Sequence, residues 1–114
     1  MKRGEVWRIN LDPTIGSETK KSRPCVIVSR DAVGILPLKI IVPLTGWQEK
    51  FEQAKWLIPI DSSSHSGLRK KTAADTFQVR SLSHARFIEK IGVLTEEEMK
   101  AIEIGLALSL DLNK

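Results

Sequence analysis

Five short segments with the pattern of β-strands follow one another through the first two-thirds of the chain. They span residues 5–11, 24–29, 38–43, 55–60 and 71–79. Residues 5–11 and 55–60 alternate polar and apolar side chains, the period of a half-buried strand, whereas 24–29 is a continuous apolar run typical of a central strand. The early connections are too short for the crossover helices that parallel strands require. The sequence therefore predicts a mainly antiparallel sheet.

A strong helix-start signal lies at residues 94–99. Thr95 can cap the first turn while Glu98 returns a hydrogen bond to it, and Leu94 and Met99 have the spacing of a hydrophobic staple across that cap. The run of glutamates that follows suits the positive end of a helix. We therefore expect a late helix to begin here, with residues 83–87 forming one separate helical turn.

Apolar side chains of this late helix lie on two faces. The first stripe comprises Met99, Ile102, Leu106 and Leu110, and the opposite stripe comprises Ile104, Leu108 and Leu112. The first stripe can pack on the strands, so the second needs another cover. A partner subunit is one interpretation, and lightly buried side chains near a C-terminus are the other.

Short strands with polar turns and one late helix indicate a small α+β domain with a curled, barrel-like sheet. A length of 114 residues suits one compact domain spanning residues 1–114, and no repeat or linker divides the chain.

The single cysteine, Cys25, lies in an apolar run, which predicts a buried and inert thiol. One free thiol and the lack of a secretion signal indicate the cytoplasm, and no run approaches the ~20 apolar residues of a membrane span. The formal net charge of +4 and the pI of about 9.4 favour polyanionic partners, although a modest lysine excess alone would explain them.

Several kinds of site are excluded by their missing motifs. The chain has no phosphate-binding P-loop and no glycine-rich dinucleotide turn. One cysteine and two histidines, His65 and His84, do not make a zinc site. Both histidines are expected at the surface, although a histidine pair acting as acid and base is a possible alternative.

Residues 16–24 hold the densest group of side chains suited to catalysis. Arg23 stands at the edge of a buried strand, where a rigid base can present a guanidinium that grips a phosphate and stabilises charge developing on phosphorus. A surface ion pair with Glu18 is the competing interpretation. Thr45 ends another buried strand beside Gly46, and its hydroxyl can bind a phosphate oxygen or a 2′-hydroxyl, although such a threonine is also a common turn residue.

Other side chains have the character of an RNA-binding surface. Trp47 and Trp56 are candidate stacking platforms for unpaired bases, with burial in the core as the alternative for Trp56. Gln78 and Arg80, two positions apart on one strand face, can reach base edges or phosphates. A basic cluster suited to phosphates, or simply to solvent, comprises Arg69, Lys70 and Lys71.

Five ordered segments together resemble the MazF/PemK toxin family. They are residues 2–7, 11–18, 23–29, 42–45 and 75–80. The most specific part is Gly16-Ser17-Glu18 followed shortly by Arg23-Pro24. The resemblance covers nearly the whole chain, including the late helix.

This resemblance implies an SH3-like barrel with a C-terminal helix, a homodimer, cleavage of single-stranded RNA at short sequences, and inhibition by a cognate antitoxin. The family's catalytic arginine and threonine match Arg23 and Thr45, and its acidic first-loop residue matches Glu18. Lys20 and Lys21 stand where other members have small residues, so loop mobility and the recognised sequence are not implied. The first-loop residues expected to close over RNA are Glu18, Thr19, Lys20, Lys21 and Ser22.

The expected reaction uses the substrate's own 2′-hydroxyl as nucleophile and leaves a 2′,3′-cyclic phosphate and a 5′-hydroxyl. Arg23 would stabilise the phosphorane, but its very high pKa makes a general-base role awkward. Thr45 would position the phosphate or the 2′-hydroxyl. No metal or other cofactor is expected, because the sequence has no carboxylate cluster.

Two other functions fit the same fold. Related CcdB-type toxins share the barrel but poison DNA gyrase through protein contacts, and a degenerate copy would bind RNA through Trp47 and the basic cluster without cutting it. For the antitoxin we expect an acidic, disordered segment that folds over the Arg23 region.

Overall fold

The computed structural model describes residues 1–112. Its strands are β1 (Glu5–Asn10), β2 (Ser22–Ile27), β3 (Leu38–Gly46), β4 (Leu57–Ile60), β5 (Thr72–Asp75), β6 (Arg80–Ser83) and β7 (Phe87–Val93). Three short 3-10 helices, η1 (Glu49–Gln53), η2 (Thr76–Gln78) and η3 (His84–Arg86), precede the α-helix α1 (Glu96–Leu110).

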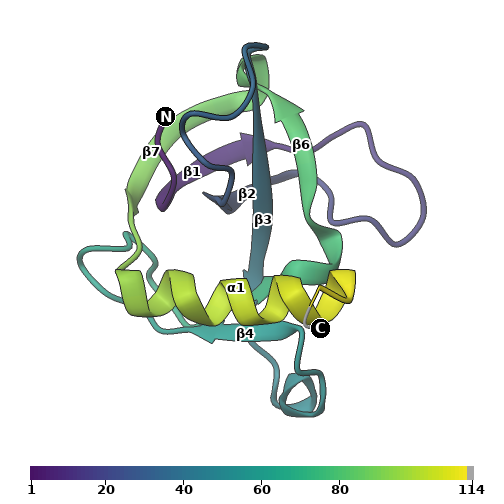
Figure 1. Ribbon diagram of the computed structural model, residues 1–114. Helices are drawn as coiled ribbons and strands as arrows, with labels where there is room; N and C mark the ends of the chain where they lie inside the picture. The colour runs from purple at the N-terminus through teal and green to yellow at the C-terminus, as the bar shows by residue number, and fades with distance from the viewer. Residues whose placement is uncertain (113–114) are drawn as a thin grey trace.

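All strand pairings are antiparallel, in the order β4-β5-β3-β2-β1-β7, with β6 also paired to β3. The long strand β3 pairs with β6 along Leu38–Ile41 and with β5 along Leu44–Gly46. Because β3 belongs to both parts, the sheet curls around it (Figure 1). The path ends at β4 and β7, so the curled sheet is open, and the prediction of a small antiparallel α+β fold is confirmed.

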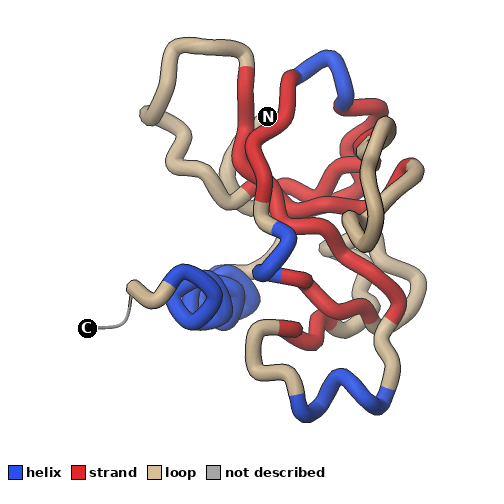
Figure 2. Tube along the Cα trace, turned by 90° about the vertical axis from the view of Figure 1, so that its right-hand side faces the viewer, coloured by secondary structure: helices blue, strands red, loops and turns tan. Residues whose placement is uncertain are grey.

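Hydrophobic clusters cover both faces of the central strands. Strand alternation sends Val26 and Val42 into one cluster and Cys25 and Ile41 into the other. Helix α1 packs on the first cluster through Met99 and other side chains, and Figure 2 shows it end-on against one side of the sheet.

The predicted helix cap is confirmed. The Thr95 hydroxyl accepts a hydrogen bond from the Glu98 N–H at 3.1 Å, and the Glu98 carboxylate accepts one from the Thr95 N–H at 2.8 Å. Leu94 and Met99 are both buried in the first cluster, as a hydrophobic staple requires. The turn expected at residues 83–87 is present as η3.

The strand count of five was wrong, because residues 1–112 form seven strands. The expected strand at 71–79 ends at Asp75, where the Thr76 N–H and hydroxyl both donate to the Trp56 carbonyl and start η2. Strand β6 is short, and β7 pairs with β1 through two register shifts, so its side chains lack a simple alternation.

The predicted stripes of α1 are partly corrected. Met99 and Ile102 are buried, but Leu110 is 53% exposed, because the helix turns its buried side toward Gly105 instead. The opposite stripe is exposed, at Ile104, Leu108 and Leu112. Within residues 1–112, no helix has the length and apolar character needed to cross a membrane.

Candidate active site

Arg23 and Thr45 lie toward the same end of two neighbouring strands of the sheet. The paired register of β2 and β3 ends at Cys25 and Pro43, so Arg23 and Thr45, each two residues further on, lie toward the same end of these strands and on the same face. The sequence placed both residues at strand ends, and the fold brings these ends together.

The Arg23 guanidinium is held at its base and open at its tip. Its Nε donates a hydrogen bond to the Lys20 carbonyl at 3.1 Å, which fixes the side chain against the first loop. The two terminal nitrogens have no partner among residues 1–112. They form a planar pair of donors, the geometry that binds phosphate in a fork.

A second arginine lies on the same face. Arg80 pairs with Ile41 in the sheet, and Ile41 and Thr45 point to the same side of β3. Cys25 lies between the two arginines. Burial raises the pKa of its thiol to about 12, although the charges of Arg80 and Arg23 act in the opposite direction. The predicted burial of the Cys25 thiol is confirmed.

The Thr45 side chain is half-buried and opposite Ala73 of β5. Its hydroxyl has no hydrogen-bond partner in the described part of the chain. The residue opposite is a small alanine, and the hydroxyl can donate to or accept from a ligand that reaches the rim.

The first loop connects β1 to β2 and projects from the sheet (Figure 1). Its base is closed by hydrogen bonds from the Leu11 N–H to the Lys21 carbonyl, at 2.9 Å, and from the Lys21 N–H to the Asp12 carboxylate, at 3.1 Å. The side chains of Lys20, Lys21 and Ser22 are exposed around Arg23. The loop therefore places two lysines beside the proposed phosphate ligand.

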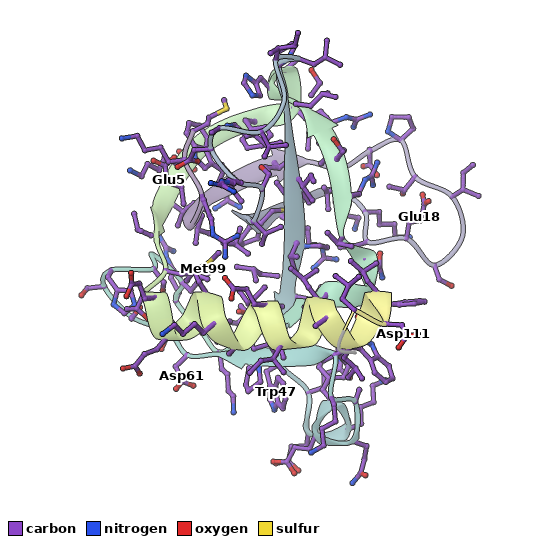
Figure 3. All side chains as sticks on the ribbon, in the orientation of Figure 1. Glu5, Glu18, Trp47, Asp61, Met99 and Asp111 are labelled. Carbon is purple, nitrogen blue, oxygen red and sulfur yellow. The ribbon has the colours of Figure 1, made fainter. Side chains whose placement is uncertain are left out.

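Glu18 lies on the outer part of this loop (Figure 3). Its carboxylate accepts a hydrogen bond from the Ile15 N–H at 2.7 Å. The alternative of an ion pair with Arg23 is wrong, because no such pair is among the ion pairs of residues 1–112. The catalytic role expected for Glu18 stays a prediction.

Gln78 contacts the first loop rather than open solvent. Its Oε1 accepts a hydrogen bond from the Thr19 N–H at 2.5 Å, and its Nε2 donates to the Ser17 carbonyl at 3.4 Å. Glu18 and Arg80 line the same hollow of about 530 Å³ with Gln78. Gln78 thus fastens the loop beside Arg80, a role that its sequence pattern did not predict.

Asp75 is a further group that its residue pattern did not single out for chemistry. It follows Ala73 by two positions on β5, so it points to the same face as Thr45. Burial raises the pKa of its carboxyl above the ordinary value, against the lowering effect of hydrogen bonds from Phe77 and Gln78. Its place between two apolar strand residues and a turn gave no local sign of this environment.

Trp47 lies where β3 ends, but part of its ring is covered. Phe51 packs edge-on against it at 5.7 Å between ring centroids, and the Lys71 ammonium lies 4.6 Å from the ring centre. The backbone N–H of Trp47 donates a hydrogen bond to the Lys71 carbonyl at 3.1 Å, which holds the two residues together. Base stacking on Trp47 stays a prediction. Trp56 is 41% exposed, so it is not a core residue.

The basic cluster divides between two sides of the structure. Lys71 joins Trp47, whereas Arg69 and Lys70 line a separate cleft with Arg8. The three side chains therefore do not form one surface with Arg23, as an RNA path on one face would require.

The two histidines have separate partners. His65 lies 3.0 Å from the Glu98 carboxylate, and His84 packs against the Phe87 ring. Their expected surface position holds for His65, whereas His84 is half-buried. Within residues 1–112, no group of three or more His, Cys, Asp or Glu side chains is arranged to hold a metal ion.

Comparison with known proteins decides the family. The model of the PemK-like, MazF-like toxins of type II toxin–antitoxin systems matches residues 2–110. This chain belongs to that family. It is also 32% identical over 118 residues to the endoribonuclease MazF9 of Mycobacterium tuberculosis, an alignment that covers 98% of each protein.

Solved structures of PemK/MazF-like toxins share the fold of this one. A MazF from Deinococcus radiodurans superposes with a TM-score of 0.78 at 19% identity, covering 97% of this chain and 96% of that one. An endoribonuclease in complex with its cognate antitoxin, from a mycobacterial species, gives a TM-score of 0.77 at 21% identity, covering 100% and 98%. The curled sheet with its C-terminal helix is therefore the fold of the family.

Proposed function

We propose that this PemK/MazF-like toxin is an endoribonuclease that cuts single-stranded RNA at a short sequence without a metal ion. Family membership and the MazF9 relative support the reaction class. The observation that carries the proposal is the Arg23 guanidinium, whose two terminal nitrogens have no partner among residues 1–112, on the same sheet face as the Thr45 hydroxyl, which has none there either. That pair of donors matches the oxygens of one phosphodiester.

The proposed reaction is an internal transfer at phosphorus. The 2′-hydroxyl oxygen attacks the adjacent phosphorus and loses its proton, the bond from phosphorus to the 5′-oxygen breaks, and that oxygen gains a proton. The products are a 2′,3′-cyclic phosphate and a 5′-hydroxyl. Arg23 stabilises the negative charge that grows on the non-bridging oxygens, and Thr45 orients the phosphate or the 2′-hydroxyl.

Residues around this pair provide the rest of the proposed RNA site. Arg80 adds positive charge on the same face of the sheet. Lys20, Lys21 and Ser22 lie exposed beside Arg23 on the first loop, which Glu18, Thr19 and Gln78 help to shape. Trp47 offers an aromatic edge for an unpaired base.

The direct test incubates the purified protein with a long RNA in EDTA and maps the ends. The proposal expects discrete cuts that leave cyclic-phosphate ends. Arg23→Ala should abolish cutting with its fold unchanged, whereas Arg30→Ala, which removes an exposed arginine in another loop, should cut like the parent. Intact RNA with gyrase binding would indicate a CcdB-type toxin, and intact but bound RNA would indicate a non-catalytic module.

We further propose a cytoplasmic homodimer that an acidic antitoxin segment inhibits. Exposed apolar side chains of α1, Ile104 and Leu108 among them, support a covering partner. The basic surroundings of Arg23 support capture of an acidic peptide. Sedimentation equilibrium tests the dimer, and cleavage retained in a saturated antitoxin complex would contradict inhibition at Arg23.

A further inference from the structure

A second basic cleft lies on the face of the sheet opposite Arg23. Its volume is about 600 Å³. The lining residues include four cations from three separate segments, Arg8 of β1, Arg69 and Lys70 of the β4–β5 loop, and Lys90 of β7.

Two of these cations are already neutralised, and two are not. Arg8 Nε lies 3.3 Å from the Glu89 carboxylate, and the Lys90 ammonium lies 3.4 Å from that of Glu5. Arg69 and Lys70 have no ionic partner among residues 1–112. The cleft therefore carries a positive charge that no side chain of the described chain balances.

The cleft wall also contains an unsatisfied hydroxyl. Thr72, the first residue of β5, lines the cleft and is only 5% exposed. Its Oγ1 is buried and has no hydrogen-bond partner among residues 1–112. Buried hydroxyls in proteins are almost always hydrogen-bonded, so this one marks a place where a ligand can supply the missing partner.

The loop that carries the two free cations is held firmly in place. A Cβ on Gly92 would lie 2.4 Å from the His65 carbonyl oxygen, and one on Gly67 would lie 2.3 Å from Ile91, so the loop and β7 are in direct backbone contact. The Val93 N–H donates to the His65 carbonyl at 2.8 Å. Because the loop is docked in this way, the positions of the following Arg69 and Lys70 are preorganised.

The cleft shares its rim with the catalytic pair. Pro24 lines the cleft and directly follows Arg23. The Lys70 ammonium lies 3.4 Å from where a Cβ of Gly46 would stand, and Gly46 directly follows Thr45. Successive strand residues point to opposite faces, so the cleft and the Arg23–Thr45 pair lie back to back across one end of β2 and β3.

We propose that this cleft binds a phosphodiester of the RNA chain that lies outside the nucleotides needed for cutting, with Arg69 and Lys70 as its ionic ligands and Thr72 as a hydroxyl ligand. This inference rests on the proposed function, because RNA reaches the cleft by passing over the rim from Arg23 and Thr45. That continuity favours RNA over an acidic peptide, which has no need to contact both faces.

The test compares two RNAs designed around a mapped cleavage site. One extends several nucleotides to both sides, and the other keeps only the nucleotides needed for cutting. The double variant Arg69→Ala/Lys70→Ala is compared with Arg30→Ala/Lys100→Ala, which removes the same two residue types from exposed positions outside the cleft. Thr72→Val removes the hydroxyl while keeping a β-branched side chain.

With the long RNA, the cleft double variant should lose about tenfold in kcat/KM, mainly through KM, since each lost contact is a charged hydrogen bond. The slope of log affinity against log salt should fall by about 1.4 for two lost contacts to a single strand. The loss in kcat/KM should be several-fold smaller with the short RNA. With either RNA, the control double variant should lose much less kcat/KM than the cleft double variant. Thr72→Val should weaken binding of the long RNA and leave binding of the short RNA unchanged.

An equal loss with both RNAs, or an equal loss in the control variant, would overturn the inference. A cleft variant that keeps RNA affinity and loses antitoxin affinity would assign the cleft to the peptide instead. If the parent protein cuts no RNA, the proposed function fails separately, and the cleft is then judged by binding of the long RNA alone. Unchanged RNA binding by the cleft variant would overturn the inference in that case.

Discussion

The side-chain amide of Gln78 bonds to the backbone of Thr19, 59 positions away, with the Thr19 N–H donating to Oε1 at 2.5 Å. The same amide donates from Nε2 to the Ser17 carbonyl. One side chain thus satisfies a donor and an acceptor of the loop, as a neighbouring strand would. The Lys20 carbonyl that follows accepts from Arg23 Nε, so Gln78 acts on the arginine through the loop.

Gln78→Ala should loosen the first loop and lower kcat about three- to tenfold, because Arg23 loses a fixed partner at Lys20. The free energy of unfolding should fall by only about 1 kcal/mol, the net value of a typical hydrogen bond. Hydrogen exchange at the Thr19 amide should quicken. Gln53→Ala, at an exposed amide in η1, is the matched control. An unchanged Thr19 exchange rate would contradict the role given to Gln78.

Arg23→Lys tests whether the site needs a guanidinium fork or only a positive charge. A lysine keeps the charge but offers one compact ammonium in place of two parallel donors. We expect kcat to fall about 100-fold or more, the range seen when one transition-state donor is removed. Single-turnover kinetics on the mapped RNA measures it. A lysine variant with near-parent kcat would show that simple charge is sufficient.

Acid should destabilise the fold through Glu5. Burial raises the pKa of this carboxyl, but the hydrogen bond from Trp7 and the charges of the N-terminus and Lys90 outweigh it and lower the pKa from 4.5 to about 2. The unfolded chain therefore takes up this proton at a higher pH than the folded one. The stability that Glu5 contributes is complete above pH 4.5 and disappears as the pH falls toward 2.

Urea unfolding between pH 2 and 7 measures this contribution. Glu5→Gln should be less stable than the parent at pH 7 and should show a shallower loss of stability between pH 4.5 and 2. Glu89→Gln, at an exposed carboxylate paired with Arg8, is the matched control. Parallel profiles for the parent and Glu5→Gln would contradict the lowered pKa.

The parts of this fold that could be predicted from the sequence are those with local signals. The Thr95 cap depends on Glu98 three residues later, and the buried strand around Cys25 is a continuous apolar run. Strand β7 escaped prediction because its register shifts against β1 break the alternation. The late helix was foreseen, but which of its sides is buried depends on the close fit of Gly105 against Ile58 and Thr76.

The same distinction applies to the candidate site. Arg23 and Thr45 could be selected because each stands at the end of an apolar strand segment. The partner of Gln78 could not, because a hydrogen bond across 59 positions leaves no mark in the neighbouring residues. The basic cleft likewise joins Arg8, Lys70 and Lys90, which only the curled sheet brings together. The sequence therefore predicted that Lys70 contacts RNA, but not on which face of the sheet it lies.

At Thr45, substitution can separate the effect of the hydroxyl on cutting from the effect of the side-chain shape on the strand. Thr45→Val keeps the β-branched shape that strands favour, so stability should stay within about 0.5 kcal/mol at this half-buried rim. The kcat should nevertheless fall about tenfold to 100-fold, because the variant loses an orienting hydrogen bond to the phosphate or 2′-hydroxyl. Thr45→Ser restores the hydroxyl and should recover most of the rate. A serine variant that cuts as slowly as the valine variant would contradict the role given to the hydroxyl, because serine keeps this group.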